Sequence, residues 1–422
     1  MINRIVLIGN GFDLAHGMQT NYKDFINNYW RNRCEEFEKH TEYIYECDEF
    51  LLRSKHYTNH FEIISSFADL YNFAEENDRK FTSKNSFFLK LTQGLNYQGW
   101  VDIESEYYSH LKNLSKSKNL DEDYNIDNLN KDFTGIINLL EKYLTSVQEN
   151  FKVDDLVKNR ITGIINHPIK LQDLSEHVIR KIIDENWKLL QSDIETYNGF
   201  FKTGYNLSST TQKIVKDFVQ NNTHSRTKEH FTIYMLKNFE NFFLSKKPHT
   251  TFLNFNYTST ESLYANPETH ICHIHGELNN KENPIIFGYG DELDDYYKDI
   301  EKLNDNRYLE NVKSINYAKT DNYKKILNLI NDGYFQVIIL GHSCGNSDRT
   351  LLNTIFENDN CASIKFFYHQ TDETKDNYLD IYKNISRNFN DKTKLRDRVV
   401  NKGYSEALIP IDLQNGSKEC LR

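Results

Sequence analysis

A pair of histidines beside a glycine is the part of this chain best suited to acid–base chemistry. The motif HIHGE spans residues 273–277 and begins within a segment, Thr269–Ile274, that has the pattern of a strand. At a strand end, the imidazole of His275 can act as a general base near neutral pH, and Gly276 lets a ligand or another segment pass close to it. The alternatives are a metal site and a core histidine whose hydrogen bonds are satisfied. The metal site would gather His270, His273 and His275 with Asp291.

Two glycine-containing turns could bind phosphate or ribose. The first, GNGFDLAHG at residues 9–17, joins an apolar strand to a helix, and its backbone amides favour an anion. Because Leu14 occupies the place of the third glycine, this is not the usual dinucleotide fingerprint, and a plain tight turn is the alternative. The second, GHSCGNSD at residues 341–348, also matches the nucleophile elbow of hydrolases. Since His369 is the only later histidine, we interpret Ser343 as a ligand contact instead of a nucleophile.

An amide and three carboxylates complete the candidates. Asn256, in the motif NFNYT at residues 254–258, can hold a ribose hydroxyl or a water. The same segment can instead cap the next helix through Thr258 or Ser259. In the motif WVDIESE, Asp102 is best explained as the N-cap of a helix whose first turn carries Glu104 and Glu106.

Parallel strands would bring these motifs together. Continuously apolar or strand-like segments predict strands at Arg4–Ile8, Thr251–Asn256, Thr269–Ile274, Pro284–Phe287, Gln336–Leu340 and Ser363–Tyr368. Helices are predicted at Asp321–Asn331 and Asp348–Glu357. Alternating strands and helices indicate an α/β fold with a doubly wound, mostly parallel, Rossmann-like sheet and helices on both faces. Ligands of such sheets bind outside the carboxyl ends of the strands, where four of the motifs stand.

A large helical insertion separates the first strand from the others. Between Tyr22 and Ser245 the pattern is helical without a convincing strand, with its clearest amphipathic helix at Leu174–Tyr197 and an exposed loop at Ser115–Asn130. We therefore expect residues 1–21 and 248–422 to form a nucleotide-binding domain and residues 22–247 to form the insertion.

Composition limits the classes of protein that the chain can be. It has 422 residues with 27 Phe and 27 Tyr, which is enough apolar surface to exclude wholesale disorder. A net charge of −10 argues against a nucleic-acid coat or a polybasic membrane anchor. With no signal peptide, no spanning segment and 6 scattered cysteines lacking a Cys-x-x-Cys pair, we expect a soluble cytoplasmic protein without structural zinc.

Five motifs in order resemble a known family. IVLIGNGFDLAHGMQTNYKDF, WVDIE, FNYT, HIHGEL and VIILGHSCGNSD are similar to those of the AbiH family of bacterial abortive infection proteins, which act in phage defence. That family is in turn distantly similar to sirtuins and sirtuin-like NAD hydrolases. The sirtuin glycine loop corresponds to Gly9, Gly11 and Gly17 here.

The sirtuin resemblance implies a set of site residues. It makes His275 the base and Asn256 the ribose-binding amide, with Gly341 and Ser343 at the adenosine end. The expected nucleotide-binding residues are Gly9, Asn10, Gly11, Asp13, His16, Gly276, Gly341, His342, Ser343 and Asp348. Thr258 replaces the sirtuin aspartate, Ile26 replaces an arginine and the cysteine zinc module is absent, so protein deacetylation is not expected.

The resulting hypothesis is an abortive-infection effector that binds a nucleotide, NAD as substrate or ligand, and hydrolyses its nicotinamide–ribose bond without a metal. The expected partners are the nucleotide, a phage-derived trigger contacting the insertion, and a second copy of the chain in a homo-oligomer, with no membrane. Two alternatives are a metal-dependent nuclease and a non-catalytic nucleotide-binding sensor.

Overall fold

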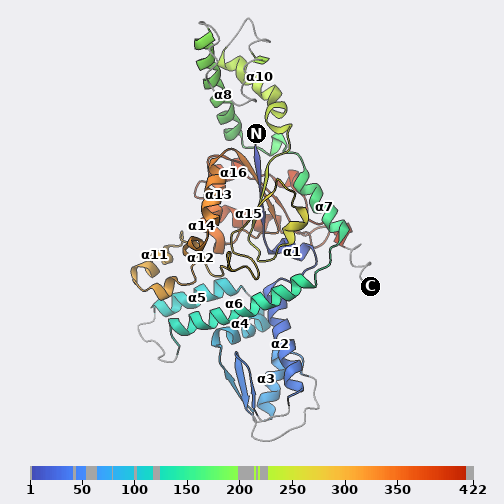
Figure 1. Ribbon diagram of the computed structural model, residues 1–422, viewed down its shortest axis with the longest axis vertical. Helices are drawn as coiled ribbons and strands as arrows, with labels where there is room; N and C mark the ends of the chain where they lie inside the picture. The colour runs from blue at the N-terminus through green and yellow to red at the C-terminus, as the bar shows by residue number, and fades with distance from the viewer. Residues whose placement is uncertain are drawn as a thin grey trace.

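A five-stranded parallel sheet forms the centre of the computed structural model (Figure 1). Its strand order is β6-β5-β1-β7-β8. The strands are β1 (Asn3–Ile8), β5 (Thr250–Asn254), β6 (His270–His273), β7 (Phe335–Leu340) and β8 (Cys361–Phe367). The structure describes residues 2–40, 44–53, 64–77, 79–98, 102–116, 124–197, 213–214, 217–218 and 227–414. The predicted α/β class and parallel sheet are confirmed.

The register of this sheet aligns the ends of the central strands. Ile8 at the end of β1 pairs with Asn254 on one side and Leu340 on the other. Asn254 in turn pairs with His273 at the end of β6. The glycine turns, the Asn256 segment and the His275 segment therefore all leave the sheet at one edge. The predicted pairing of the first strand with strands from residues 250–370 in one sheet is confirmed.

The predicted strand at Pro284–Phe287 is wrong. These residues form an extended connection that folds back on the loop after β6, where Glu277 N donates to Asn283 O and Ile286 N donates to His275 O. Pro284 has no N–H to donate to a ladder, so an apolar run that contains it is a poor strand.

Helices cover both faces of the sheet, as predicted. Alternate sheet residues such as Ile5 and Val337 pack with α13 (Asn322–Asn331), α14 (Arg349–Phe356), α15 (Tyr378–Arg387) and α16 (Lys392–Arg398) on one face. On the opposite face, Val6 and Ile338 pack against α1 (Asn10–Ala15) and α7 (Asp155–Asn166). Residues 5 and 6 thus point to opposite faces, as the period of a strand requires.

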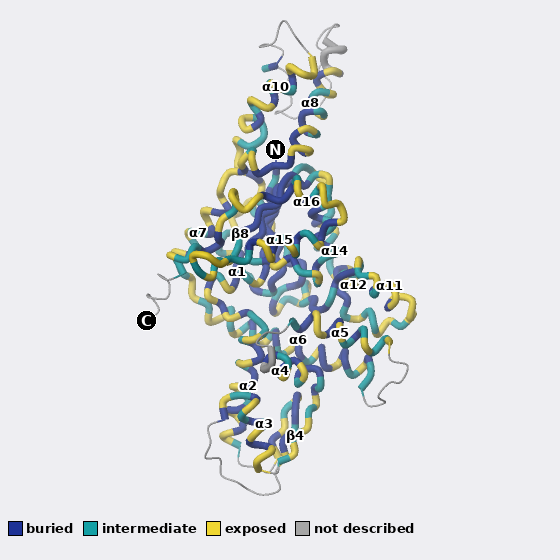
Figure 2. The backbone as a smooth tube through the Cα atoms, turned by 180° about the vertical axis from the view of Figure 1, so that it is seen from behind, coloured by how far each residue is buried: buried dark blue, intermediate teal, exposed yellow. Residues whose placement is uncertain are grey.

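Apart from α1 and α7, the α-helices between β1 and β5 form two bodies at opposite ends of the strands (Figure 1). At the carboxyl ends lie α2 (Tyr22–Glu38), α3 (Phe67–Glu76), α4 (Ser86–Gln98), α5 (Ile103–Lys116) and α6 (Ile126–Glu149), which share one core. At the amino ends, α8 (Glu176–Tyr197) and α10 (Lys228–Phe239) pack on Ile2 and Ala362 and project away from the sheet (Figure 2). The division at residues 21/22 and 247/248 stays a prediction.

The insertion also contains a sheet, contrary to prediction. Strands β2 (Ile44–Glu46), β3 (Phe50–Arg53) and β4 (Lys80–Ser83) pair antiparallel. They escaped prediction because three- and four-residue strands are too short to show an alternating pattern.

The other helix predictions are mostly confirmed. The predicted Leu174–Tyr197 helix matches α8, whose Val178, Ile182 and Leu190 are buried, whereas the side chains of Ile194 and Tyr197 lie outside the described residues. The loop predicted at Ser115–Asn130 is too long, because an Asn125 capping box starts α6 at Ile126. Short helices α11 (Asp295–Lys302) and α12 (Lys313–Asn316) precede α13. Among the described residues no helix is both long and apolar enough to cross a membrane.

Candidate functional site

A cavity of about 1920 Å³ opens at the carboxyl edge of the sheet, between the sheet and helices α2 and α6. Every predicted site residue except Gly276 lines it: Gly9, Asn10, Gly11, Asp13, His16, Asn256, His275, Gly341, His342, Ser343 and Asp348. Tyr22, Glu104 and Lys313, none of which was predicted as a site residue, line it as well. The topology therefore gathers residues that lie more than 300 positions apart in the chain.

Glycines allow the loops after β1 and β7 to pack on each other. A Cβ at Gly341 would lie 2.0 Å from the amide nitrogen of Phe12, and Gly341 has a φ of +69°. The Gly11 amide donates to the Gly341 carbonyl at 2.8 Å. A Cβ at Gly9 would lie 2.6 Å from the Cα of His342. Close approach is confirmed here, between two loops; contact of the same glycines with a ligand stays a prediction.

Gly276 lets another segment pass behind His275. Its φ is +84°, and a Cβ there would lie 2.1 Å from the carbonyl oxygen of Pro284. Of the two occupants predicted for this space, the structure contains the chain segment. Gly276 thus shapes the site from outside the cavity lining.

Asp13 is a buried carboxyl group facing the loop after β5. The Thr258 hydroxyl donates to its Oδ2, and the side chain of Asp13 is 1% exposed. Burial raises the pKa of Asp13 to about 6, although hydroxyl hydrogen bonds from Thr258 and Thr260 act in the opposite direction. The predicted capping role of Thr258 is therefore wrong. The next helix is a 3₁₀ turn whose N-cap residue, Ser259, makes no capping hydrogen bond with its side chain.

Asn256 joins the loops after β5 and β1. Its side-chain amide donates to the carbonyl oxygen of Gly9 at 3.1 Å, and its own backbone amide donates to Asn254 Oδ1 at 2.8 Å. Asn256 is 8% exposed and lines the cavity. Its predicted position beside the glycine loop is thus found.

His273 belongs to a separate buried network. Its Nε2 lies 3.0 Å from Glu261 Oε1, while Glu261 Oε2 accepts from the Asn254 amide at 2.6 Å. Burial lowers the pKa of His273, but the hydrogen bond and charge of Glu261 outweigh burial and raise the pKa above its usual value. Glu261, on the 3₁₀ turn after β5, thus links Asn254 at the end of β5 to His273 at the end of β6.

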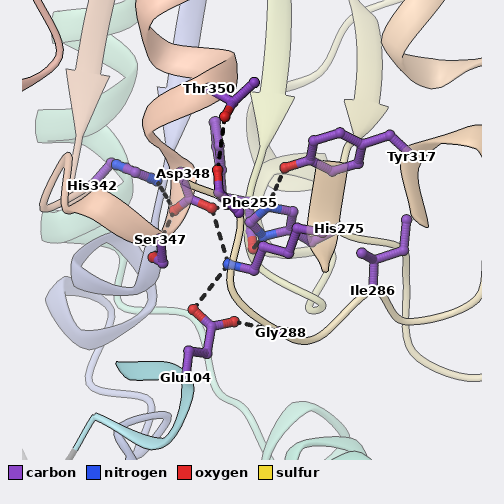
Figure 3. Close-up of polar contacts among 12 residues, drawn as sticks. Glu104, Phe255, His275, Ile286, Gly288, Tyr317, His342, Ser347, Asp348 and Thr350 are labelled. Atoms are coloured by element: carbon purple, nitrogen blue, oxygen red, sulfur yellow. Dashed lines mark hydrogen bonds and ion pairs between the residues drawn. The ribbon is translucent and has the colours of Figure 1, made fainter. Parts of the chain in front are cut away.

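His275 has the geometry of a buried base (Figure 3). Its Nδ1 lies 3.1 Å from the carbonyl oxygen of Phe255 and donates to it, because a carbonyl can only accept. In the neutral ring Nε2 is therefore unprotonated, and it lies 3.2 Å from the Tyr317 hydroxyl. Burial and then the charge of Lys313 lower the pKa of His275. The ring is 3% exposed, so it fits a core histidine by its burial and a base by its place in the cavity.

A chain of buried charges leads from His275 to the insertion (Figure 3). Asp348 Oδ1 lies 3.2 Å from His275 Nε2 and 3.0 Å from Lys313 Nζ. Lys313 Nζ also lies 2.9 Å from Glu104 Oε2 on α5. Burial alone would raise the pKa of Asp348, but the opposing charge of Lys313 holds that pKa well below its usual value. Burial raises the pKa of Glu104 against the opposing charge of Lys313.

The remaining predicted histidines have local partners. His342 Nδ1 accepts from the Cys344 amide at 2.9 Å, so its Nε2 carries the proton that faces Asp348 Oδ2 at 3.4 Å. His16 contacts the Phe12 carbonyl through Nδ1 at 2.7 Å and the Tyr264 hydroxyl through Nε2 at 2.6 Å. Both His16 nitrogens are satisfied, which is typical of a core histidine.

The structure does not gather the residues of the alternative metal site. His270 is exposed, His273 pairs with Glu261, and Asp291 lies 3.5 Å from Arg349. Across the described ranges, no group of three or more His, Cys, Asp or Glu side chains has the arrangement of a metal site.

Lys313 was missed as a site residue, and Glu104 was a candidate that we assigned to the first turn of a capped helix and not to the site. Asp102 accepts from the amides of Glu104 and Ser105 and caps α5, as predicted, and Glu106 is exposed. Trp100 and Val101 of the same motif lie outside the described residues. The capped first turn of a helix already accounted for the presence of the three carboxylates. Nothing in the local pattern therefore indicated that Glu104 would be buried against Lys313.

Comparison with known proteins shows a family match over most of the chain. A family model described as bacteriophage abortive infection AbiH matches residues 5–370 of the chain. That span includes the sheet and the helices between β1 and β5. No curated protein and no solved structure matches.

Proposed function

The chain belongs to the bacteriophage abortive infection AbiH family, and from that premise we propose that it is an effector that binds NAD and hydrolyses the nicotinamide–ribose bond. The family itself indicates an anti-phage, abortive-infection role. NAD as the ligand, the hydrolytic step and a sirtuin-like site are the parts that we propose.

The topology supports a nucleotide ligand. Counted in chain order, the five strands run 3-2-1-4-5, which is the order of doubly wound dinucleotide-binding sheets. In such sheets the ligand lies outside the carboxyl ends, where the strand order reverses. The reversal falls between β1 and β7, and the loops after both strands line the cavity. A volume of about 1920 Å³ exceeds the 300–1,000 Å³ of typical small-ligand sites, so a dinucleotide fits by size.

One observation carries the hydrolytic step: His275 lines the cavity, and its Nδ1–H donates to the Phe255 carbonyl, which leaves Nε2 as the basic nitrogen of the neutral ring. A fixed tautomer with a lowered pKa is the form that a general base needs near neutral pH. Asp348, 3.2 Å from Nε2, stabilises the imidazolium that forms when the ring takes a proton.

The proposed reaction balances with water as the only co-reactant. The bond from ribose C1′ to the nicotinamide nitrogen breaks, its electron pair leaves with nicotinamide, and positive charge develops on the sugar as in glycosidases. Water attacks C1′ and gives its proton to His275 Nε2, from which the proton passes to solvent. The carboxylates of Asp348 and Glu104 favour the developing cation. Asn256 would orient the ribose or the water.

Incubation of the full chain with NAD tests this proposal. We expect free nicotinamide and ADP-ribose by chromatography, at equal rates with a chelator and with added divalent metal, and none with His275→Gln. Binding of NAD by calorimetry without nicotinamide release would favour the non-catalytic sensor. Chelator-sensitive cleavage of nucleic acid with NAD left intact would favour the nuclease and contradict the proposal.

A further inference from the structure

The ammonium of Lys313 and the imidazole of His275 share one carboxylate oxygen. Asp348 Oδ1 lies 3.0 Å from Lys313 Nζ and 3.2 Å from His275 Nε2. Lys313 is 2% exposed, at the start of α12, and was not predicted to take part in the site. A buried ammonium is costly unless it is fully paired, so its retention beside a base calls for a physical reason.

The groups around His275 come from every element that packs on it. Tyr317 follows α12 and Asp348 precedes α14, while the loop after β7 supplies His342. The Phe255 carbonyl comes from the segment after β5. Lys313 is the cation held directly on the Asp348 oxygen that faces His275, and Glu104 stands behind it on α5.

We propose that Lys313 is a positioning residue that keeps the His275 imidazole unprotonated, and that Glu104 holds the Lys313 ammonium in place. The role of His275 as a base rests on the proposed function. The effect of Lys313 on the charge of the ring does not, because it follows from the positions of the charges.

The electrostatic reason is competition for Asp348. A carboxylate 3.2 Å from an imidazole nitrogen stabilises the protonated ring, which cannot accept another proton. An ammonium 3.0 Å from the same oxygen offsets that attraction and repels a second cation. The direction of the His275 pKa agrees, since burial and Lys313 lower it against the opposing charge of Asp348.

Glu104 explains how a buried lysine stays charged. With Asp348 alone, the Lys313 ammonium would have a single carboxylate partner to offset its loss of hydration. Glu104 Oε2, 2.9 Å from Lys313 Nζ, supplies a second partner. Two carboxylates together raise the pKa of Lys313 although burial lowers it. Because Glu104 belongs to α5, the insertion contributes to the site formed by the sheet (Figure 3).

Nuclear magnetic resonance of the histidine rings tests this inference without any substrate. The full chain, labelled with ¹³C in its 15 histidines, would be titrated with acid, and the His275 signal identified by its loss in His275→Gln. The test variant is Lys313→Met with Glu104→Gln, which removes both charges of the pair and keeps their approximate volume. The matched control is Glu106→Gln, which removes an exposed carboxylate from the same helix. A second control, Lys313→Arg, keeps the positive charge at position 313.

In the wild type we expect the titration midpoint of His275 to lie below 6.5, the usual pKa of a histidine. In the double variant its midpoint should rise by about one pH unit or more, a tenfold gain in proton affinity. Glu106→Gln and Lys313→Arg should leave the midpoint near the wild-type value. An unshifted midpoint in a folded double variant overturns the proposal. A wild-type His275 that is protonated at pH 6.5 and above overturns it as well, and this second measurement does not depend on the folding of the double variant. Failure of NAD hydrolysis alone would leave this result standing.

Discussion

The side-chain amide of Asn256 donates a hydrogen bond of 3.1 Å to the backbone carbonyl of Gly9. This contact joins the loop after β5 to the loop after β1, the neighbouring strand in the sheet. It places an amide beside the glycine turn, at the edge where a ligand of this topology binds.

Replacing Asn256 should impair both the loop contact and the reaction. For Asn256→Ala we expect a fall in nicotinamide release of roughly 10²-fold or more, the scale on which loss of a fixed polar group acts in catalysis. Loss of one hydrogen bond should lower the free energy of unfolding by about 1 kcal/mol. Rates normalised to folded protein, with thermal unfolding as the parallel measurement, separate the two effects.

A double variant distinguishes catalysis from packing. If Asn256 and His275 act on one ribose, Asn256→Ala with His275→Gln should be little slower than either single variant. Losses that multiply in the double variant would mean that the two residues act independently, against the proposed mechanism.

How far the sequence alone predicts the site is clear at the strand ends. The segments before Gly9 and Gly341 are continuously apolar and the one before Asn256 is strand-like, which is typical of parallel strands, so their meeting at one edge could be predicted. His275 could be placed near that edge for the same reason. What the pattern could not supply is which neighbour each side chain contacts. The glycines face a second loop, and His273 and His275 belong to different networks.

Contacts between distant elements set the limit. Glu104 and Lys313 lie 209 residues apart in the chain. Each lies in the first turn of a helix, and the local pattern around one gives no indication of the other. The apolar Pro284–Phe287 segment matched a strand by composition, but its pairing was decided by Pro284 and by the space that Gly276 leaves. In the first case the local rules held but left the long-range contact unspecified, and in the second the local rule that disfavours proline in a strand outweighed the apolar composition.

The pH dependence of activity should follow His275. Because burial and Lys313 lower the pKa of His275, the ring keeps its basic form below pH 6.5, and the rate should decline only as the pH falls through the lowered value. The rate of NAD hydrolysis at saturating substrate across pH 4.5 to 8 measures this. An acid limb centred above pH 6.5 would contradict the assignment of His275 as the base.

Substitution of His275 should also reveal its burial. With Nδ1 on the Phe255 carbonyl and only 3% exposure, His275→Ala should cost roughly 1–3 kcal/mol of stability. We expect the rate per folded molecule to fall by roughly 10²–10⁴-fold as well, the range for loss of a general base. His16→Ala is the contrast: it removes a ring whose nitrogens are satisfied by Phe12 and Tyr264, so its effect on the rate per folded molecule should be weaker than that of His275→Ala.

The His273–Glu261 pair predicts a pH-dependent stability. The folded-state pKa of His273 is raised, so its stabilising contribution is complete below pH 6.5 and is lost as the pH rises through the raised value. We expect His273→Gln to lose more stability at pH 6 than at pH 9, measured by urea unfolding. His270→Gln, an exposed histidine on the same strand, should show no such difference. Equal losses for His273→Gln at both pH values would mean that the ring is neutral throughout.

Replacing the carboxyl group of Asp13 by an amide should stabilise the folded protein near neutral pH. Its pKa rises from 3.8 to about 6 on folding because it is buried, so the folded state holds the proton more tightly and stability falls as the pH rises across that interval. Above pH 6 the ionised Asp13 therefore carries a penalty on the order of 2–3 kcal/mol. Asn at this position can still accept from the Thr258 hydroxyl without bearing a charge. We expect Asp13→Asn to raise the thermal midpoint at pH 7.5 and to change it little at pH 4.

If Asp13 contacts the nucleotide as predicted, the same variant should also bind NAD more weakly, as measured by calorimetry. It would then gain stability and lose function. A lower midpoint at pH 7.5 would show that the buried carboxylate is stabilised by its surroundings, contrary to the direction of its pKa.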